Sequence, residues 1–173
     1  MATPFQVIER TERLVEAELC ERRWTFGATI GNATAGFDLA GKFASRSHRQ
    51  HLRHLCETEL RERGRVLVHA FIAAHAAMSA KPSEDHRRSA KVWIDKSVSA
   101  EAKDLEQFLW KPRAALGETG TPDHLDVQLW HEIDRAHVRI DDELNRIGRN
   151  RVECVRRWIV RGIAPFITPF RRS

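Results

Sequence analysis

The chain has no tyrosine, only two methionines and only three cysteines among its 173 residues. The cysteines, Cys20, Cys56 and Cys154, are odd in number and far apart, which is typical of reduced thiols and argues against a disulfide framework. No apolar run approaches the roughly 18 residues that cross a membrane, and the first residues become charged too early to form the apolar core of a secretory leader. We therefore expect a cytoplasmic protein.

Motifs of several catalytic classes are also missing. The sequence has no Gly-x-Ser-x-Gly, no phosphate-cradling glycine spacing with its lysine, and no cysteine with an evident histidine partner. It also lacks the Glu-x-x-His pair that is typical of carboxylate-bridged metal bundles. Catalytic sites assemble from distant residues, so an enzyme is not excluded, but it has no positive support and is the less favoured class.

The sequence is rich in apolar residues at helical spacing, most clearly in its last third. Thr121 can cap a helix and Pro122 suits the first helical position, while Gly162 and Pro165 predict its end. The 4-4-3 spacing predicts one long helix over about 122–161, with its weakest point at Gly148. The apolar positions are Leu125, Leu129, Ile133, Ala136, Ile140, Leu144, Ile147, Val155 and Trp158.

A second stretch repeats this spacing and predicts a helix over about 45–79. Its stripe is interrupted at Arg63. Two long helices with the same spacing are natural packing partners, so we expect them to form the spine of the fold. The stripe consists of Leu52, Cys56, Leu60, Leu67, Phe71, Ala74 and Met78.

The remaining stretches predict shorter helices. Residues 4–26 have one apolar face, expected to contain Phe5, Ile8, Val15, Leu19 and Phe26. Residues 27–43 are rich in glycine and allow two interpretations. One is a loop at Gly31, which we favour because glycine weakens helices, followed by a short helix. The other is a continuous helix in which Gly27-x-x-x-Gly31 and Gly36-x-x-x-Ala40 let a neighbouring backbone approach.

Residues 83–112 predict a helix capped by Ser83, which restarts near Ser97 or Ser99 and stops at Pro112. No strand pattern is evident. The expected fold is therefore all-α, a bundle of five or six helices. Its domain organisation is a single helical domain over 1–162 and a Pro/Phe/Arg tail over 163–173.

Charge is distributed unevenly along the chain. The net charge is +5, but the segment from Arg146 to the C-terminus has eight arginines and one acidic residue, a net +7. The rest of the chain is therefore at −2. This distribution places any contact with an anionic partner at the C-terminal end.

The C-terminal end alternates these arginines with aromatic residues. A protein groove, a nucleic acid or an anionic membrane surface would each suit it, and the alternative is that its apolar residues pack within the bundle. The candidate partner-binding residues are Arg149, Arg156, Arg157, Trp158, Arg161, Phe166, Phe170, Arg171 and Arg172.

Three histidines at three-residue spacing, His48, His51 and His54, are the candidate metal ligands. Two of them could share an ion on one helix face, but a site would need ligands from another helix. The simpler interpretation is a solvated basic face, so we expect no metal and no cofactor.

The function we favour is therefore a non-catalytic helical interaction or regulatory module. It self-associates, and its basic, aromatic C-terminal end contacts a protein partner. The alternatives are nucleic-acid binding through residues 146–172 and a metal- or cofactor-dependent bundle that uses the histidines.

Overall fold

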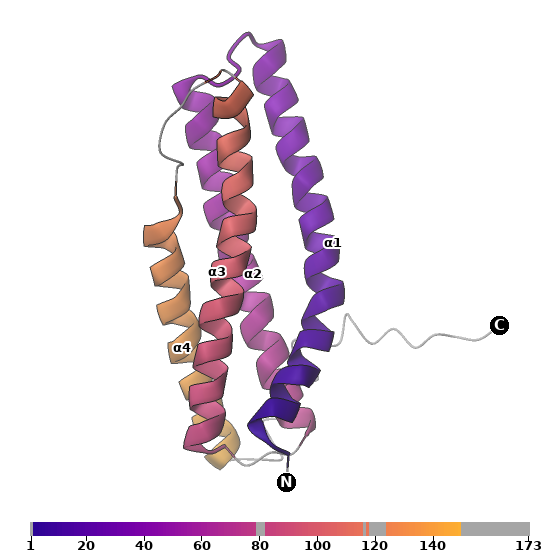
Figure 1. Ribbon diagram of the computed structural model, residues 1–173, viewed down its shortest axis with the longest axis vertical. Helices are drawn as coiled ribbons and strands as arrows, with labels where there is room; N and C mark the ends of the chain where they lie inside the picture. The colour runs from indigo at the N-terminus through magenta and orange to yellow at the C-terminus, as the bar shows by residue number, and fades with distance from the viewer. Residues whose placement is uncertain (1, 79–81, 116, 118–123, 150–173) are drawn as a thin grey trace, which may run out of the picture.

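The computed structural model describes residues 2–78, 82–115, 117 and 124–149. These residues form four helices, α1 (Pro4–Leu39), α2 (Arg46–Ala77), α3 (Glu84–Ala115) and α4 (Asp126–Arg149) (Figure 1). The described segments contain no strand, so the all-α prediction is confirmed. The predicted number of five or six helices is not confirmed, because two expected breaks do not occur.

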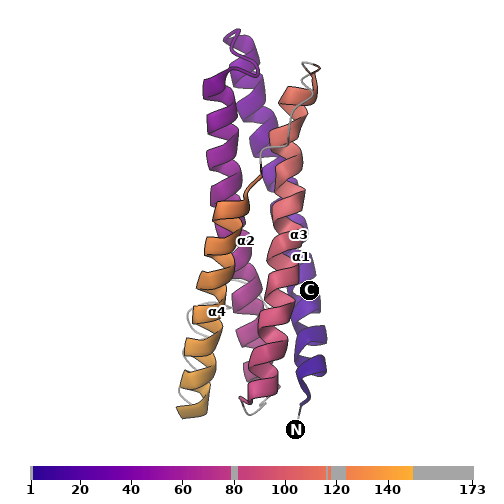
Figure 2. The same ribbon diagram turned by 60° about the vertical axis from the view of Figure 1, so that its left-hand side comes forward.

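The helices are arranged around the antiparallel pair α2 and α3. Helix α1 packs against one side of this pair and α4 against the other (Figures 1 and 2). Helix α4 is shorter and covers only the half of the pair that lies near the N-terminus of α1. None of the helices in the described ranges is both long and apolar enough to span a bilayer.

Helix α1 runs without interruption through all three of its glycines, so the predicted loop at Gly31 is wrong. Its start is fixed by a capping box, in which the Thr3 side chain accepts from the backbone N–H of Gln6 and the Gln6 side chain accepts from that of Thr3. The helix ends at Leu39, and the chain turns beyond it at Gly41, whose φ of +65° is in the left-handed region that glycine adopts easily, and at Ala44, whose φ is 53°. The burial of the apolar face of α1 therefore outweighs the low helix propensity of its glycines.

The buried face of α1 begins at Val7 rather than at Phe5. Phe5 is 75% exposed, which contradicts its predicted place on the apolar face. Thr11 takes a core position because its hydroxyl donates to the carbonyl of Val7 at 2.7 Å and is satisfied within the helix. The buried residues are Val7, Thr11, Val15, Leu19, Phe26 and Ile30.

Helix α3 is also continuous, contrary to the predicted restart near Ser97 or Ser99. Val98 lies between these serines and is completely buried, so the apolar stripe runs through them. Ser83 caps as predicted, since its hydroxyl accepts from the backbone N–H of His86 at 3.3 Å. Pro112 lies in the last turn, where it removes a single backbone hydrogen bond and does not end the helix.

Helix α4 begins at Asp126, later than the predicted start at 122. The carboxylate of Glu106 on α3 accepts from the backbone N–H of Leu125 at 2.8 Å, and so supplies the capping interaction expected of Thr121. Thr121 and Pro122 lie outside the described residues, as does the predicted continuation from 150 to 161. The predicted stripe is confirmed within α4 and next to it by the burial of Leu125, Ile133, Ala136, Ile140, Leu144 and Ile147.

Arg63, which interrupts the apolar stripe of α2, is completely buried. Its Nε donates to Glu59 at 3.0 Å, and its Nη1 donates to Glu101 and to Asp104 on α3, both at 2.7 Å. The guanidinium also lies over the ring of Phe26 at 5.8 Å. A buried charge of this kind is tolerated only because acidic side chains surround it.

Two arginines of α1 extend this ion-pair network. Arg22 pairs with Glu59 on α2 at 2.9 Å, and Arg23 pairs with Glu101 on α3. Together with Arg63 and Asp104, the network holds three positive and three negative groups. It therefore fixes the register of α1, α2 and α3 at one level of the bundle.

Candidate interaction groove on α1

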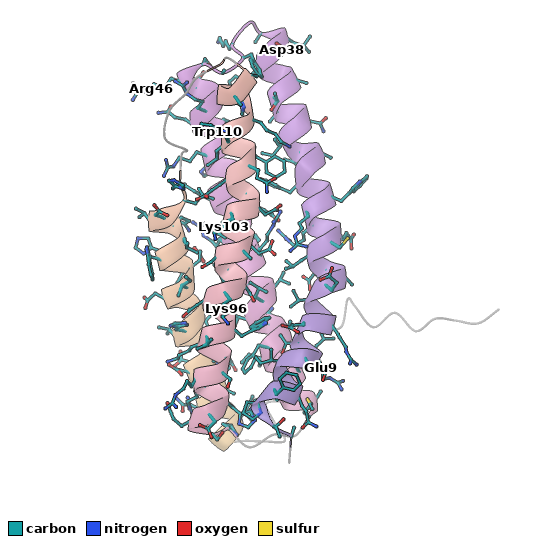
Figure 3. All side chains as sticks on the ribbon, in the orientation of Figure 1. Glu9, Asp38, Arg46, Lys96, Lys103 and Trp110 are labelled. Atoms are coloured by element: carbon teal, nitrogen blue, oxygen red, sulfur yellow. The ribbon has the colours of Figure 1, made fainter. Side chains whose placement is uncertain are left out.

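A cavity of about 590 Å³ lies between the C-terminal half of α1 and the end of α3. Asp38 of α1 and Lys111 of α3 give it a polar rim, while most of its lining is apolar or small. In Figure 3, Asp38 and Trp110 mark this end of α1 and α3. A preformed, largely apolar concavity with few polar groups is the usual setting of a binding site.

Aromatic contacts support the floor of this groove. Phe108 of α3 meets Phe26 of α1 edge to face, with ring centroids 5.5 Å apart, and the ammonium of Lys111 lies 5.0 Å from the Phe108 ring centroid. Phe26 is buried in the core and Phe108 packs against it. The groove is therefore held open by packed side chains on both helices.

The α1 wall of the groove contains Gly27 and Gly31. A Cβ built on either glycine meets no atom within 4 Å, and the same is true of Gly36, which lies outside the groove. Glycine inside a helix costs about 1 kcal/mol relative to alanine. No contact within the described chain uses the missing side chains of these glycines, so nothing in the monomer offsets their cost. The open space above them is available to the backbone of another chain.

These glycines belong to an uncharged strip along the outer face of α1, which we call the glycine strip. At about 100° per residue its members lie within about 100° of one another around the helix. Trp24, in the middle of the strip, is 79% exposed. The strip consists of Ala17, Cys20, Trp24, Gly27, Ala28, Gly31 and Ala35.

The two described cysteines differ in environment. Cys20 is exposed on the glycine strip, whereas Cys56 is buried and its Sγ donates to the carbonyl of Leu105 at 3.6 Å. Burial raises the pKa of the Cys56 thiol to about 12. Cys56 is therefore an unreactive core residue rather than a nucleophile.

The side chains of the partner-binding residues predicted from the sequence lie outside the described part of the structure. Arg149 is the last residue of α4, and its side chain is outside the described part. The other eight predicted residues, Arg156, Arg157, Trp158, Arg161, Phe166, Phe170, Arg171 and Arg172, also lie outside it. Their role stays a prediction.

The three candidate metal-ligating histidines lie in different environments. His48 is completely buried, its Nδ1 accepts from the backbone N–H of Ala44 at 3.0 Å, and its ring stacks on Phe37. His51 and His54 are exposed. Burial, and to a lesser extent His51, lowers the pKa of His48. The one imidazole of the three that is buried is thus held by the core.

Within the described residues, one group of three potential ligands lies close enough to share an ion. It contains Glu106, His124 and Asp126. However, Glu106 already accepts from the backbone N–H of Leu125, and the His124 side chain is half exposed. These contacts explain the cluster as the cap of α4, and we assign it no metal.

Sequence reasoning identified the spacing of the glycines but not the role of Trp24. The continuous-helix interpretation of residues 27–43 named Gly27-x-x-x-Gly31 as a surface for close approach. The structure confirms that the helix is continuous as far as Leu39. The role of Trp24 could have been found from its spacing, because it lies three residues before Gly27 and therefore on the same helix face.

No protein-family model, curated protein or solved structure matches the chain.

Proposed function

We propose that this chain is a helical interaction module that self-associates through the glycine strip and its groove. The single observation that carries the proposal is the pairing of an open, glycine-walled groove with a large exposed indole on the same helix face. Each copy therefore offers both a projection, Trp24, and a hollow beside Gly31 that can receive it. A surface that contains both halves of a contact suits an isologous dimer.

An antiparallel pairing centred beside Gly27 brings the two halves together. In that arrangement position 24 of one copy lies opposite position 31 of the other, so each indole covers the partner's Gly31. The absence of side chains at both glycines supports a close approach of the two helices. Cys20 then lies opposite Ala35 of the other copy.

The size of the strip predicts a weak association. From Ala17 to Ala35 the strip is about 28 Å long, and a helix is about 10 Å wide, so α1 alone buries roughly 280 Å² per copy. Even with the groove walls added, the total falls in the range of transient complexes. We therefore expect a micromolar rather than a nanomolar dissociation constant.

Sedimentation velocity over a concentration series tests the proposal. The wild-type chain is expected to shift from monomer to dimer, and Gly31→Leu, which fills the hollow, is expected to stay monomeric. Gly36→Leu is the matched control, since Gly36 lies outside the groove and also has open space above it. A wild type that is monomeric at every concentration, or equal dimerisation of both variants, contradicts the proposal.

The basic, aromatic C-terminal end is proposed as a second contact, made with a protein partner. The support is the net +7 carried by the segment from Arg146 onward, together with its Phe and Trp residues. Deleting residues 163–173 is expected to weaken partner capture and to leave helicity unchanged. Loss of folding in the truncated chain would instead assign the tail a structural role.

Nucleic-acid binding through residues 146–172 is the second candidate function, favoured by the same uneven charge. Titration with an oligonucleotide at two salt concentrations separates it from protein binding. Phosphate contacts release counterions, so affinity is expected to fall steeply as salt rises. Affinity that does not change with salt excludes this function.

A further inference from the structure

A second cavity, of about 370 Å³, opens between α2 and α4, on the other side of the bundle from most of α1. Figure 2 shows these two helices side by side and running in the same direction. Four arginines and one acidic residue line the cavity, a net +3, and we call it the arginine groove. These residues are Arg61 and Arg65 from α2, and Glu132, Arg135 and Arg139 from α4.

The acidic residue, Glu132, already has several donors. Its side chain is 5% exposed, and its Oε1 accepts from Gln128 at 2.5 Å and from Arg135 at 2.6 Å. Arg61 Nε lies 3.6 Å from the same oxygen, too far for a hydrogen bond. One carboxylate therefore cannot satisfy the donors that surround it.

The remaining donors have capacity for a ligand. Arg61 Nε is buried and has no hydrogen-bond acceptor among the described residues. Arg139 makes no hydrogen bond or ion pair with any other residue in the described ranges, while Arg65 pairs with Glu62 of its own helix at 2.5 Å. A buried donor without an acceptor is costly, and an oxyanion in the groove would supply that acceptor.

The spacing of the arginines indicates what kind of anion would fit. Arg61 and Arg65 are one turn apart on α2, and Arg135 and Arg139 are one turn apart on α4, so each pair is separated by about 6 Å along its axis. A Cβ built on Gly64 would lie 4.0 Å from the Cβ of Glu132, so these two positions of the parallel helices face each other. Arg65 and Arg135 therefore lie at nearly the same level. Arg61 lies roughly one turn before them and Arg139 roughly one turn after them, so the four side chains form an elongated row. An elongated row of planar guanidinium donors suits two linked phosphate groups better than a single compact oxyanion.

We propose that the arginine groove binds a diphosphate group. The site's net charge of +3 suits a ligand with two or three negative charges. The inference does not depend on self-association, because it rests on a different surface. The diphosphate could be free or part of a nucleotide, and the two sources share the chemistry that the arginines would recognise.

Isothermal titration of the full chain with inorganic pyrophosphate, without divalent cations, tests the proposal. Arg139→Gln is expected to weaken binding about tenfold or more, because it removes charge-assisted hydrogen bonds. Arg146→Gln is the matched control, since it removes the same charge from the same helix at a side chain that is 69% exposed. Glu132→Gln is expected to tighten binding several-fold, because it frees Arg61 and Arg135.

A second titration with a nucleoside diphosphate distinguishes the two sources. Tighter binding of the nucleotide than of pyrophosphate supports a nucleotide ligand, and equal binding supports the free diphosphate. The proposal is overturned if pyrophosphate does not bind. It is also overturned if Arg139→Gln and Arg146→Gln weaken binding equally, or if an oligonucleotide binds at the groove and pyrophosphate does not compete. Circular dichroism of each variant verifies that the fold is intact.

Discussion

Replacing Arg63 by methionine is expected to destabilise the bundle strongly. Arg63 is the centre of the ion-pair network, with a side chain that is completely buried. Methionine fills much of the same volume but leaves Glu59, Glu101 and Asp104 without their shared cation. Glu59 and Glu101 keep Arg22 and Arg23 as partners, whereas Asp104 loses the only ion-pair partner it has among the described residues.

The burial of each group sets the size of the effect. Glu101 and Glu59 are 5% and 10% exposed, so solvent compensates them little, while Asp104 is 39% exposed and contributes less. Removing one partner of a buried ion pair costs about 3–5 kcal/mol. At about 2–4 °C per kcal/mol for a domain of this size, the melting temperature is expected to fall by about 6–20 °C.

Urea denaturation followed by circular dichroism measures the loss. Arg13→Met is the control, because the Arg13–Glu9 pair is solvent-exposed and such pairs contribute about 1 kcal/mol or less. A second variant that replaces Arg63 and its three acidic partners with apolar residues of similar volume is expected to recover most of the stability. If Arg63→Met costs no more than Arg13→Met, the network does not hold the helices in register.

Three further predictions concern single residues. Gly31→Ala and Gly36→Ala are each expected to raise the free energy of unfolding of the monomer by about 0.5–1 kcal/mol, measured by denaturation at low concentration, because both sites are open; only Gly31→Ala is expected to weaken self-association. Burial lowers the pKa of His48 below 6.5, so the unfolded state binds the proton more readily. The stability that depends on neutral His48 is therefore present above about pH 6.5 and lost as the pH falls below it. Between pH 7.5 and 5, urea unfolding should show a smaller loss in the free energy of unfolding for His48→Gln than for the wild type. Thiol labelling read by mass spectrometry should modify Cys20 in the native protein and Cys56, with its pKa of about 12, only after unfolding.

The apolar stripes of α2, α3 and α4 could be predicted from the sequence because burial follows the helical period. Helix continuity through Gly31 and Ser97 could not, since local propensity favours a break there and tertiary packing on the opposite face decides the outcome. The start of α4 was misplaced for a similar reason. Its capping interaction comes from Glu106, a residue of another helix.

The role of Arg63 also could not be predicted from the sequence pattern. An arginine in an apolar stripe indicates a break in the stripe, and its partners Glu101 and Asp104 are distant in the sequence. The groove on α1 was anticipated only through its glycine spacing. The arginine groove was not anticipated at all, because its two pairs lie on helices whose parallel alignment emerges only in the fold.

Oxidative crosslinking tests self-association through α1 most directly. Within one copy, Cys20 and position 35 are about 22 Å apart along the helix, too far for a disulfide. In the antiparallel pair they lie opposite each other, so Ala35→Cys is expected to give a covalent dimer joined between position 20 of one copy and position 35 of the other, identified by mass spectrometry. Gly36→Cys turns the thiol about 100° around the helix from position 35, off the glycine strip, and is expected to give no such link. A covalent dimer that forms equally in both variants, or in neither, would contradict the account.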